Sequence, residues 1–335
     1  MSKKILIGII IVVVILGIGL CWSIQKQPGK YTGPIEDITI AVSKLEATTL
    51  VRIALKNGYF EEQGLNVKMT EQDLGKFSLQ EVFDGRADIA TVAETPVVKN
   101  SFKRDDFRIF ATIHKSSTNV KLIARKDHGI NSVQDLKGKK VGTTVGTVGE
   151  FFLSSFLLYS GLSVKDIELI DEKPAALFEM LQAGEIDAFA LREPHVYRAQ
   201  ENLGDVAIVF VRDDVYEATF NVVALTDFIK AKPQIIKRFL RALLQTESFV
   251  KNNRSEAINL ISQDLQLDRG YLDKTWEESQ FKLILNQDLI VTMEYEARWV
   301  IESGSVETTE VPNYLDYIYF DALEEVKPEA VGIMR

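Results

Sequence analysis

The chain has 335 residues, of which 46% are hydrophobic and 26% are charged; these values are ordinary for a globular protein long enough for two domains. The formal net charge of −9 at pH 7 argues against a nucleic-acid partner, because no basic stripe is available to neutralise phosphates. The single cysteine excludes an intramolecular disulfide and any metal site built from several cysteines.

The first predicted element is an apolar N-terminal segment. Lys3 and Lys4 precede an apolar run from Ile5 to Leu20, a pattern that resembles a secretory signal and places the N-terminus in the cytoplasm. The run is close to the lower limit for a membrane-spanning helix, about 17 residues. We therefore assign residues 1–22 to a signal or membrane anchor, and residues 23–34, rich in proline and glycine, to a tether.

The cysteine after the apolar run is a candidate for lipid attachment. The residues before Cys21 resemble a bacterial lipobox only in part, because Leu20 stands where a small residue is usual. Three alternatives stay open: a lipid anchor at Cys21, an uncleaved helical anchor, and ordinary cleavage of a signal peptide. In each of them the folded part lies in the periplasm or at the outer face of the cytoplasmic membrane.

Short strands alternate with amphipathic helices in the first two thirds of the folded part. This alternation predicts an α/β protein with largely parallel sheets. The expected strands are residues 38–42, 65–69, 89–93, 108–113, 121–125, 140–143, 167–170, 188–191, 207–211 and 221–225. After Asp227 the pattern predicts helices alone, over residues 233–251, 255–263, 269–281, 289–302 and 314–326, which would pack around one lobe.

Two stretches of the chain repeat one pattern. Each has a glycine that ends a helix, an aspartate three residues later, a short apolar strand, and a glutamate six residues beyond the aspartate. The first runs from Gly85 to Glu94 and the second from Gly184 to Glu193. The repeat predicts two similarly built lobes whose strand ends face a common cleft, where small ligands bind in α/β proteins. Chance recurrence of a common helix–strand–helix pattern is the alternative.

These motifs, taken in order, resemble those of a known family. The run from Gly58 to Val67, the two repeated stretches, the run from Asp135 to Gly142 and the triplet 193–195 are similar to segments of periplasmic substrate-binding proteins of ABC importers. The subgroup is the one that binds nitrate, sulfonates, taurine or thiamine precursors. The resemblance covers about residues 36–225.

The resemblance implies a periplasmic-binding-protein fold of type II: two α/β lobes, two crossover strands and a C-terminal helical extension. Lobe one would comprise residues 35–126 and 222–335, and lobe two residues 127–221, with crossovers near residues 123–126 and 221–223. A monomeric, membrane-tethered protein of this kind captures a small organic anion or zwitterion, such as a sulfonate, a taurine-like compound or a pyrimidine precursor. It then delivers this ligand to the permease and ATPase subunits of an ABC importer.

Catalysis, a metal and a cofactor are not expected. The chain lacks the HExxH, GxSxG, P-loop and GxGxxG motifs. Its three histidines, His114, His128 and His195, are too far apart in sequence for a local metal-binding motif. A ligand-sensing module that reports to a separate signalling partner is the alternative function.

One candidate binding site lies in the segment 143–150, which joins a strand to a helix. Gly146 and Gly149 let the backbone approach a ligand, and free N–H groups at a helix start favour an anion. The Thr147 hydroxyl and the backbone amides of Val148 and Gly149 are the expected donors. A tight turn without a ligand is the alternative.

Charged side chains at strand ends complete the predicted site. Glu94 and Glu193 are each positioned either to hold a ligand amine or to cap the following helix. Arg192 stands where the family often has an aromatic residue, and its planar cation suits a carboxylate, phosphonate or sulfonate. The expected ligand contacts also include Ser43, Lys44, Glu46, Thr95 and Asn221.

Overall fold

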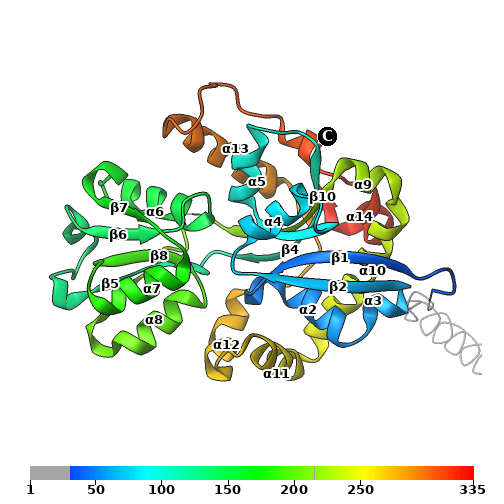
Figure 1. Cartoon of the computed structure of the whole chain (residues 1–335), viewed down its shortest axis with the longest axis horizontal. Helices are drawn as coiled ribbons and strands as arrows, with labels where there is room; N and C mark the ends of the chain where they lie inside the picture. The colour runs from blue at the N-terminus through cyan, green and yellow to red at the C-terminus, as the bar shows by residue number, and fades with distance from the viewer. Residues whose placement is uncertain (1–30, 215) are drawn as a thin grey trace, which may run out of the picture. The chain divides into compact units, whose positions relative to one another are not determined.

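The computed structural model describes residues 31–214 and 216–335 (Figure 1). The predicted anchor at residues 1–22 and the lipidation candidate Cys21 lie outside the described residues. Residues 34–335 form one unit, which holds both of its large sheets. Of the helices in the described ranges, none combines the length and the apolar character needed to cross a membrane.

The first sheet has five strands in the order β2-β1-β3-β10-β4. β1 pairs in parallel with β2 and β3, whereas β10 runs antiparallel to β3 and β4. Every residue of the central strand β3 is buried, as expected for a strand covered on both faces. The strands are β1 (Glu36–Ser43), β2 (Leu65–Gln72), β3 (Ile89–Ala93), β4 (Phe107–Ser116) and β10 (Ala218–Leu225).

The second sheet repeats this topology in the order β7-β6-β8-β5-β9. β6 pairs in parallel with β7 and β8, and β5 runs antiparallel to β8 and β9. The strands are β5 (Val120–Arg125), β6 (Lys140–Thr143), β7 (Glu168–Asp171), β8 (Ala188–Arg192) and β9 (Ala207–Phe210). β3 and β8, the two strands of the repeated sequence pattern, therefore occupy equivalent central positions.

The aspartates of the repeat form equivalent hydrogen bonds in the two sheets. Asp88 Oδ2 accepts a hydrogen bond from the backbone amide of Thr39 at 2.8 Å, and Asp187 Oδ2 accepts one from that of Lys140 at 2.7 Å. Each carboxylate thus ties the start of its own strand to the neighbouring parallel strand. The prediction of an α/β protein is confirmed. The expectation of largely parallel sheets is wrong, because β10 and β5 run antiparallel to both of their neighbours, and the apolar pattern of a strand does not record its direction.

The helices begin and end at residues that suit their ends. α7 (Pro174–Ala183) has proline in its first turn, where the missing N–H is not needed, and ends at Gly184 in the left-handed conformation with φ +75°. The other helices before β10 are α2 (Thr49–Lys56), α3 (Tyr59–Glu62), α4 (Gly75–Phe83), α5 (Glu94–Ser101), α6 (Val148–Tyr159) and α8 (His195–Leu203).

The helices after β10 pack on the elements of the first sheet. α10 contacts α2, α3 and α14, α11 contacts α2, and α13 contacts α5. These late helices are α9 (Thr226–Ala231), α10 (Pro233–Asn252), α11 (Arg254–Leu265), α12 (Arg269–Thr275), α13 (Gln287–Glu302) and α14 (Asp321–Val326). A two-stranded pair, β11 (Leu285–Asn286) with β12 (Val331–Gly332), joins this region to the chain end.

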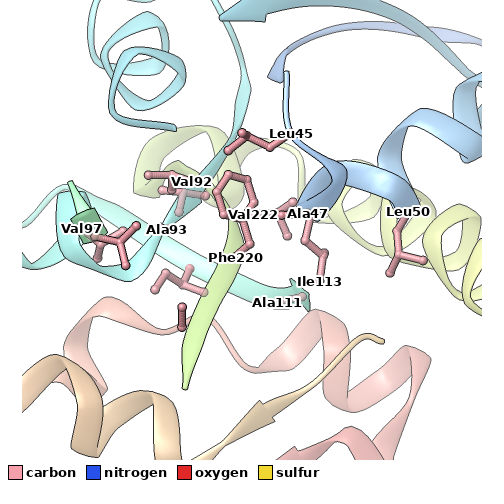
Figure 2. Close-up of a cluster of buried hydrophobic side chains, with 14 of the residues drawn as sticks. Leu45, Ala47, Leu50, Val92, Ala93, Val97, Ala111, Ile113, Phe220 and Val222 are labelled. Atoms are coloured by element: carbon pink, nitrogen blue, oxygen red, sulfur yellow. The ribbon is translucent and has the colours of Figure 1, made fainter. Parts of the chain in front are cut away.

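The core of the first sheet surrounds β3, β4 and β10. Figure 2 shows apolar side chains of these strands next to those that follow β1. The labelled residues are Leu45, Ala47, Leu50, Val92, Ala93, Val97, Ala111, Ile113, Phe220 and Val222. Because this core is packed on both sides of β3, the end of β3 is held in a fixed position, and the candidate site lies at that end.

The chain passes between the sheets a few residues earlier than predicted. β5 contains most of the expected crossover 123–126, yet it pairs with β8 and β9 of the second sheet. β10 contains the expected crossover 221–223, yet it pairs with β3 and β4 of the first sheet. The connections therefore lie at residues 117–119 and 211–217. The apolar pattern of a strand does not record the sheet in which it pairs, so the sequence misplaced both connections.

Candidate functional site

A buried arginine without a hydrogen-bond partner among the described residues marks the candidate site. Arg192 is the last residue of β8, and only 4% of its surface is exposed. None of its three guanidinium nitrogens has a partner among the described residues. The guanidinium lies over the ring of Phe220, 5.2 Å from its centroid. Buried charges are normally paired, because transferring an unpaired ion from water to the protein interior costs on the order of several kcal/mol of stability. Arg192 is therefore positioned to receive an anion.

Glu46 lies near Arg192 in a short 3₁₀ helix that follows β1 (Glu46–Thr48). The side-chain amide of Asn119 donates to Glu46 Oε1 at 2.5 Å, while Oε2 has no partner within the described ranges. Burial raises the pKa of Glu46 to about 7, and the Asn119 hydrogen bond and the charge of Arg192 offset only part of this effect. The carboxyl group therefore changes its charge close to neutral pH.

Glu94 begins α5 at the end of β3 and is fully buried. Its Oε2 accepts hydrogen bonds from the backbone amide and the hydroxyl of Thr219, at 2.9 and 2.7 Å, and Oε1 has no partner in the described part of the chain. Asn221 supports this arrangement, since its Nδ2 donates to Thr219 Oγ1 at 3.0 Å. Burial raises the pKa of Glu94, and the Thr219 hydrogen bonds and the charge of Arg192 oppose the rise. The predicted residue Asn221 thus orients Glu94 through Thr219.

Three further polar side chains near Arg192 were missed by the sequence analysis. His114 on β4 is fully buried with both ring nitrogens unpartnered among described residues, and burial together with the Arg192 charge lowers its pKa well below the usual value. The hydroxyls of Tyr216 and Tyr271 are also buried and unpartnered there. Burial raises the pKa of both tyrosines, so both are neutral hydroxyls. No local motif distinguishes these residues, because their burial arises from the tertiary packing.

Glu193 caps the following helix, α8, which is one of the two roles expected for it. Its Oε1 accepts from Lys121 Nζ at 3.0 Å, and its Oε2 accepts from the backbone amide of Tyr197, in α8, at 2.8 Å. Both carboxylate oxygens therefore have partners. The two glutamates of the repeat occupy equivalent strand ends but differ in chemistry, since Glu94, unlike Glu193, keeps an oxygen without a partner in the described ranges.

Two of the three donors expected in the segment 143–150, the Thr147 hydroxyl and the Gly149 amide, form hydrogen bonds within that segment. Thr147 Oγ1 donates to the Thr144 carbonyl at 2.6 Å and accepts from the amide of Gly149 at 3.3 Å, while the amide of Gly146 donates to Glu150 Oε2 at 2.7 Å. Val148, the first residue of α6, is buried. These hydrogen bonds favour the turn alternative, and a ligand role for this segment stays a prediction.

Gly149 has a packing role instead. A Cβ atom there would lie 2.8 Å from the Ala190 carbonyl oxygen and 2.8 Å from Thr143 Oγ1. The glycine thus allows α6 to lie directly against β8, the strand that carries Arg192.

The other predicted residues divide into interior and surface positions. Ser43 is buried, and its backbone amide donates to Thr91 Oγ1 at 3.1 Å. Thr95 donates to Glu296 Oε1 at 3.0 Å. The Lys44 side chain is 52% exposed and lies 4.0 Å from Glu71, at the edge of an open cavity of about 600 Å³. The structure therefore brings Glu46, Glu94 and Arg192 together and leaves Lys44 outside this group.

Contacts between elements of the two sheets enclose the group. On one side, Lys99 Nζ lies 2.5 Å from Glu150 Oε2, and the ring of Phe151 in α6 contacts Trp299 in α13 with centroids 5.3 Å apart. On another, the rings of Tyr197 and Tyr271 stack with centroids 4.4 Å apart. Lys76 Nζ also donates to the Val145 carbonyl at 2.7 Å.

The raised pKa of Glu46 predicts a pH-dependent stability of the ligand-free protein. The folded state favours the protonated carboxyl, so its stabilising contribution is complete below the unfolded pKa of 4.5 and is lost as the pH rises through about 7. We expect Glu46→Gln, which keeps the acceptor for Asn119, to be more stable than the wild type at pH 8 by up to about 3 kcal/mol. The advantage should vanish near pH 4.5. Urea unfolding at both pH values measures it, and an equal difference at the two would contradict the prediction.

Comparison with known proteins gives one family and one fold. The profile of the family described as "NMT1/THI5 like" matches residues 47–257. A putative aliphatic sulfonates-binding protein of Bacillus subtilis is 23% identical over 301 residues, which cover 87% of this chain and 89% of that protein. The taurine-binding periplasmic protein of Escherichia coli is 22% identical over 193 residues, covering 57% of this chain and 59% of that protein.

The solved structures similar to this chain share its fold. The alkanesulfonate-binding protein SsuA from Xanthomonas axonopodis pv. citri, bound to MOPS, has a TM-score of 0.76 at 16% identity, covering 86% of this chain and 100% of that one. The desulfurization enzyme DSZB has a TM-score of 0.61 at 14% identity, covering 88% and 99%. The fold is thus that of periplasmic binding proteins, and it also occurs in an enzyme.

Proposed function

The chain belongs to the NMT1/THI5-like family, and from this premise we propose that it is an extracytoplasmic solute-binding protein that holds a small organic anion or zwitterion at Arg192. The observation that carries the proposal is the buried guanidinium with no partner among the described residues. A sulfonate or carboxylate would accept two parallel hydrogen bonds from it, in a place where water is excluded and such bonds are strong.

The two five-stranded sheets would form the cores of two lobes, joined at residues 117–119 and 211–217. Arg192 belongs to the second sheet, whereas Glu46 and Glu94 follow strands of the first. A ligand that contacts both sets would stabilise the closed form and shift the population toward it. An ABC permease that recognises the closed form would then receive the ligand, with the N-terminal segment as the tether to the membrane.

Binding without catalysis is the function that the relatives support. The relatives named above are described as binding proteins, and the sulfonate- and taurine-binding descriptions suggest the ligand class. The similarity to DSZB rests on fold alone, at 14% identity. In this chain the only cysteine is Cys21, so a cysteine nucleophile in the folded part is excluded.

A ligand screen tests the proposal. Full-length protein in detergent would be heated with alkanesulfonates, aminosulfonates, carboxylates, phosphonates, nitrate and pyrimidines. We expect at least one organic acid to raise the melting temperature by several degrees, because a ligand at about 100 times its Kd adds about 2.7 kcal/mol of stability. Small-angle scattering should show a more compact particle with the same acid. A screen in which no acid binds, or only neutral compounds do, would contradict the proposal.

A further inference from the structure

A second buried carboxyl group lies beside Glu94. Glu296, on α13, has no exposed surface, and its Oε1 accepts from the Thr95 hydroxyl at 3.0 Å. Its Oε2 has no partner among the residues described. Thr95 directly follows Glu94 at the start of α5, so this hydrogen bond joins the start of α5 to α13. The result is two carboxyl groups in the interior, each with one oxygen bonded to a threonine and one oxygen free.

The groups that face this carboxyl pair are few. The Tyr216 hydroxyl lies near both, since the charges of Glu94 and Glu296 add to burial in raising the pKa of Tyr216. Burial also raises the pKa of Glu296 well above the usual value, the charge of Glu94 adds to the rise, and the Thr95 hydrogen bond and the Lys99 charge oppose it. Burial raises the pKa of Tyr314, and the charge of Glu296 adds to the rise, so the Tyr314 hydroxyl is neutral. The charge of Arg192 opposes the rise in the pKa of Glu94 and of Tyr216.

The nearby lysine already has partners. Lys99 Nζ lies 2.5 Å from Glu150 Oε2 and 5.0 Å from the centroid of the Trp299 ring. It therefore does not supply the counter-ion that two buried carboxylates require. Each buried carboxylate raises the free-energy cost of ionising the other. Arg192 offsets part of this cost for Glu94, so the pair still needs a shared proton or a further cation.

We infer that the free oxygens of Glu94 and Glu296, with the Tyr216 hydroxyl, form a subsite for a protonated amine of the ligand. This inference rests on the proposed function, in which the acidic group of the same ligand binds Arg192. The guanidinium of Arg192, without a partner among the described residues, is the independent observation that points to a ligand here. It also indicates how the ligand lies: its acidic group at the end of β8 and its amine between Glu94 and Glu296. The ligand is therefore bipolar.

The ligand-free pair holds a proton, which an ammonium group replaces. Amine binding should therefore release a proton, and the affinity for an amine-bearing acid should fall as the pH is lowered, by at most about tenfold per pH unit for one proton. An acid without an amine leaves the proton in place, so its affinity should not show this dependence.

Matched pairs of ligands test the subsite. The probes are taurine with ethanesulfonate, β-alanine with propionate, and 2-aminoethylphosphonate with ethylphosphonate, titrated calorimetrically into full-length protein in two buffers of different ionisation enthalpy. We expect at least one amine-bearing acid to bind at least about tenfold more tightly than its partner, the range for a charged hydrogen bond, and to release a proton.

Glu296→Gln should bring the ratio of the two affinities, amine-bearing acid to its partner, close to one. It should also remove the proton release, while keeping the acceptor for Thr95. Glu294→Gln is the matched control, because Glu294 lies on the same helix with a 42% exposed side chain, 3.6 Å from Arg298. The control should leave the ratio unchanged. A ratio that Glu296→Gln does not alter, or tighter binding of the acid that lacks the amine, would overturn the subsite while leaving the proposed function intact. Failure of every acid to bind would overturn both.

Discussion

Replacing Arg192 by methionine is expected to weaken the binding of an acidic ligand at least about a hundredfold. The guanidinium offers several charge-assisted hydrogen bonds, each contributing about 1.5–3 kcal/mol, and methionine offers none. The ligand-free protein should be as stable as the wild type or more so, because the substitution replaces a buried charge without a partner among the described residues by an apolar chain of similar length. Lost binding with retained or increased stability distinguishes a ligand contact from a structural residue.

The measurement pairs calorimetric titration with thermal unfolding of the ligand-free protein. Arg298→Met is the control, since the Arg298 side chain is 56% exposed and lies 3.6 Å from Glu294 on the same helix. This substitution should change neither the ligand affinity nor the melting temperature appreciably. If Arg192→Met bound the acid as tightly as the wild type, the anion position would have to be sought elsewhere.

Arg52→Ala is expected to lower the free energy of unfolding by about 3–5 kcal/mol, the usual cost of breaking a buried ion pair. The side chain is 1% exposed and joins several elements. It donates to Thr48 Oγ1 at 2.8 Å and to the Ser43 carbonyl at 2.9 Å, at the end of β1, and it pairs with Glu71 at 2.9 Å and Asp264 at 2.6 Å. Its loss would leave several polar groups without this partner and would remove the link from Asp264 in α11 to the end of β1.

Lys56→Ala is the matched control for this prediction. Lys56 lies on the same helix, α2, and pairs with the same Asp264 at 2.9 Å, but its side chain is 36% exposed. A partly exposed pair of this kind contributes about 0–1 kcal/mol. Urea unfolding of both variants gives the comparison, and equal losses for the two would refute the assignment of Arg52 as the main link.

Local signals in the sequence predicted most of the fold. The strands expected at residues 89–93 and 140–143 agree with β3 and β6, because each is a short apolar run between clear turn residues. The helix expected at 269–281 ends earlier, since α12 stops at Thr275 and a 3₁₀ turn follows. The helix expected at 314–326 divides into a 3₁₀ turn and α14. The spacing of apolar residues is similar in these short turns and in a continuous helix, so the sequence pattern does not reveal where the two helices are interrupted.

The site was predictable only where a charge lies at a strand end. Arg192 ends a strand, Glu94 and Glu46 follow strands, and these positions alone indicated a cleft. The donors near Gly149 looked free in the sequence, but whether an amide is free depends on side chains such as Thr147, whose orientation the sequence does not record. Glu296 lies more than a hundred residues from the repeat and contacts Thr95 only through the packing of α13 on α5.

If the protein opens and closes as proposed, the guanidinium of Arg192, which has no partner among the described residues, would also limit closure without a ligand. In the enclosed form it is 4% exposed and lacks an acceptor among the described residues, whereas opening the lobes would return it to water. Closure without a ligand therefore carries an electrostatic penalty that an acidic ligand removes. On the proposed function, the charge that selects the ligand would also keep the empty protein from adopting the closed form, so an importer that recognises this form would seldom engage an empty protein.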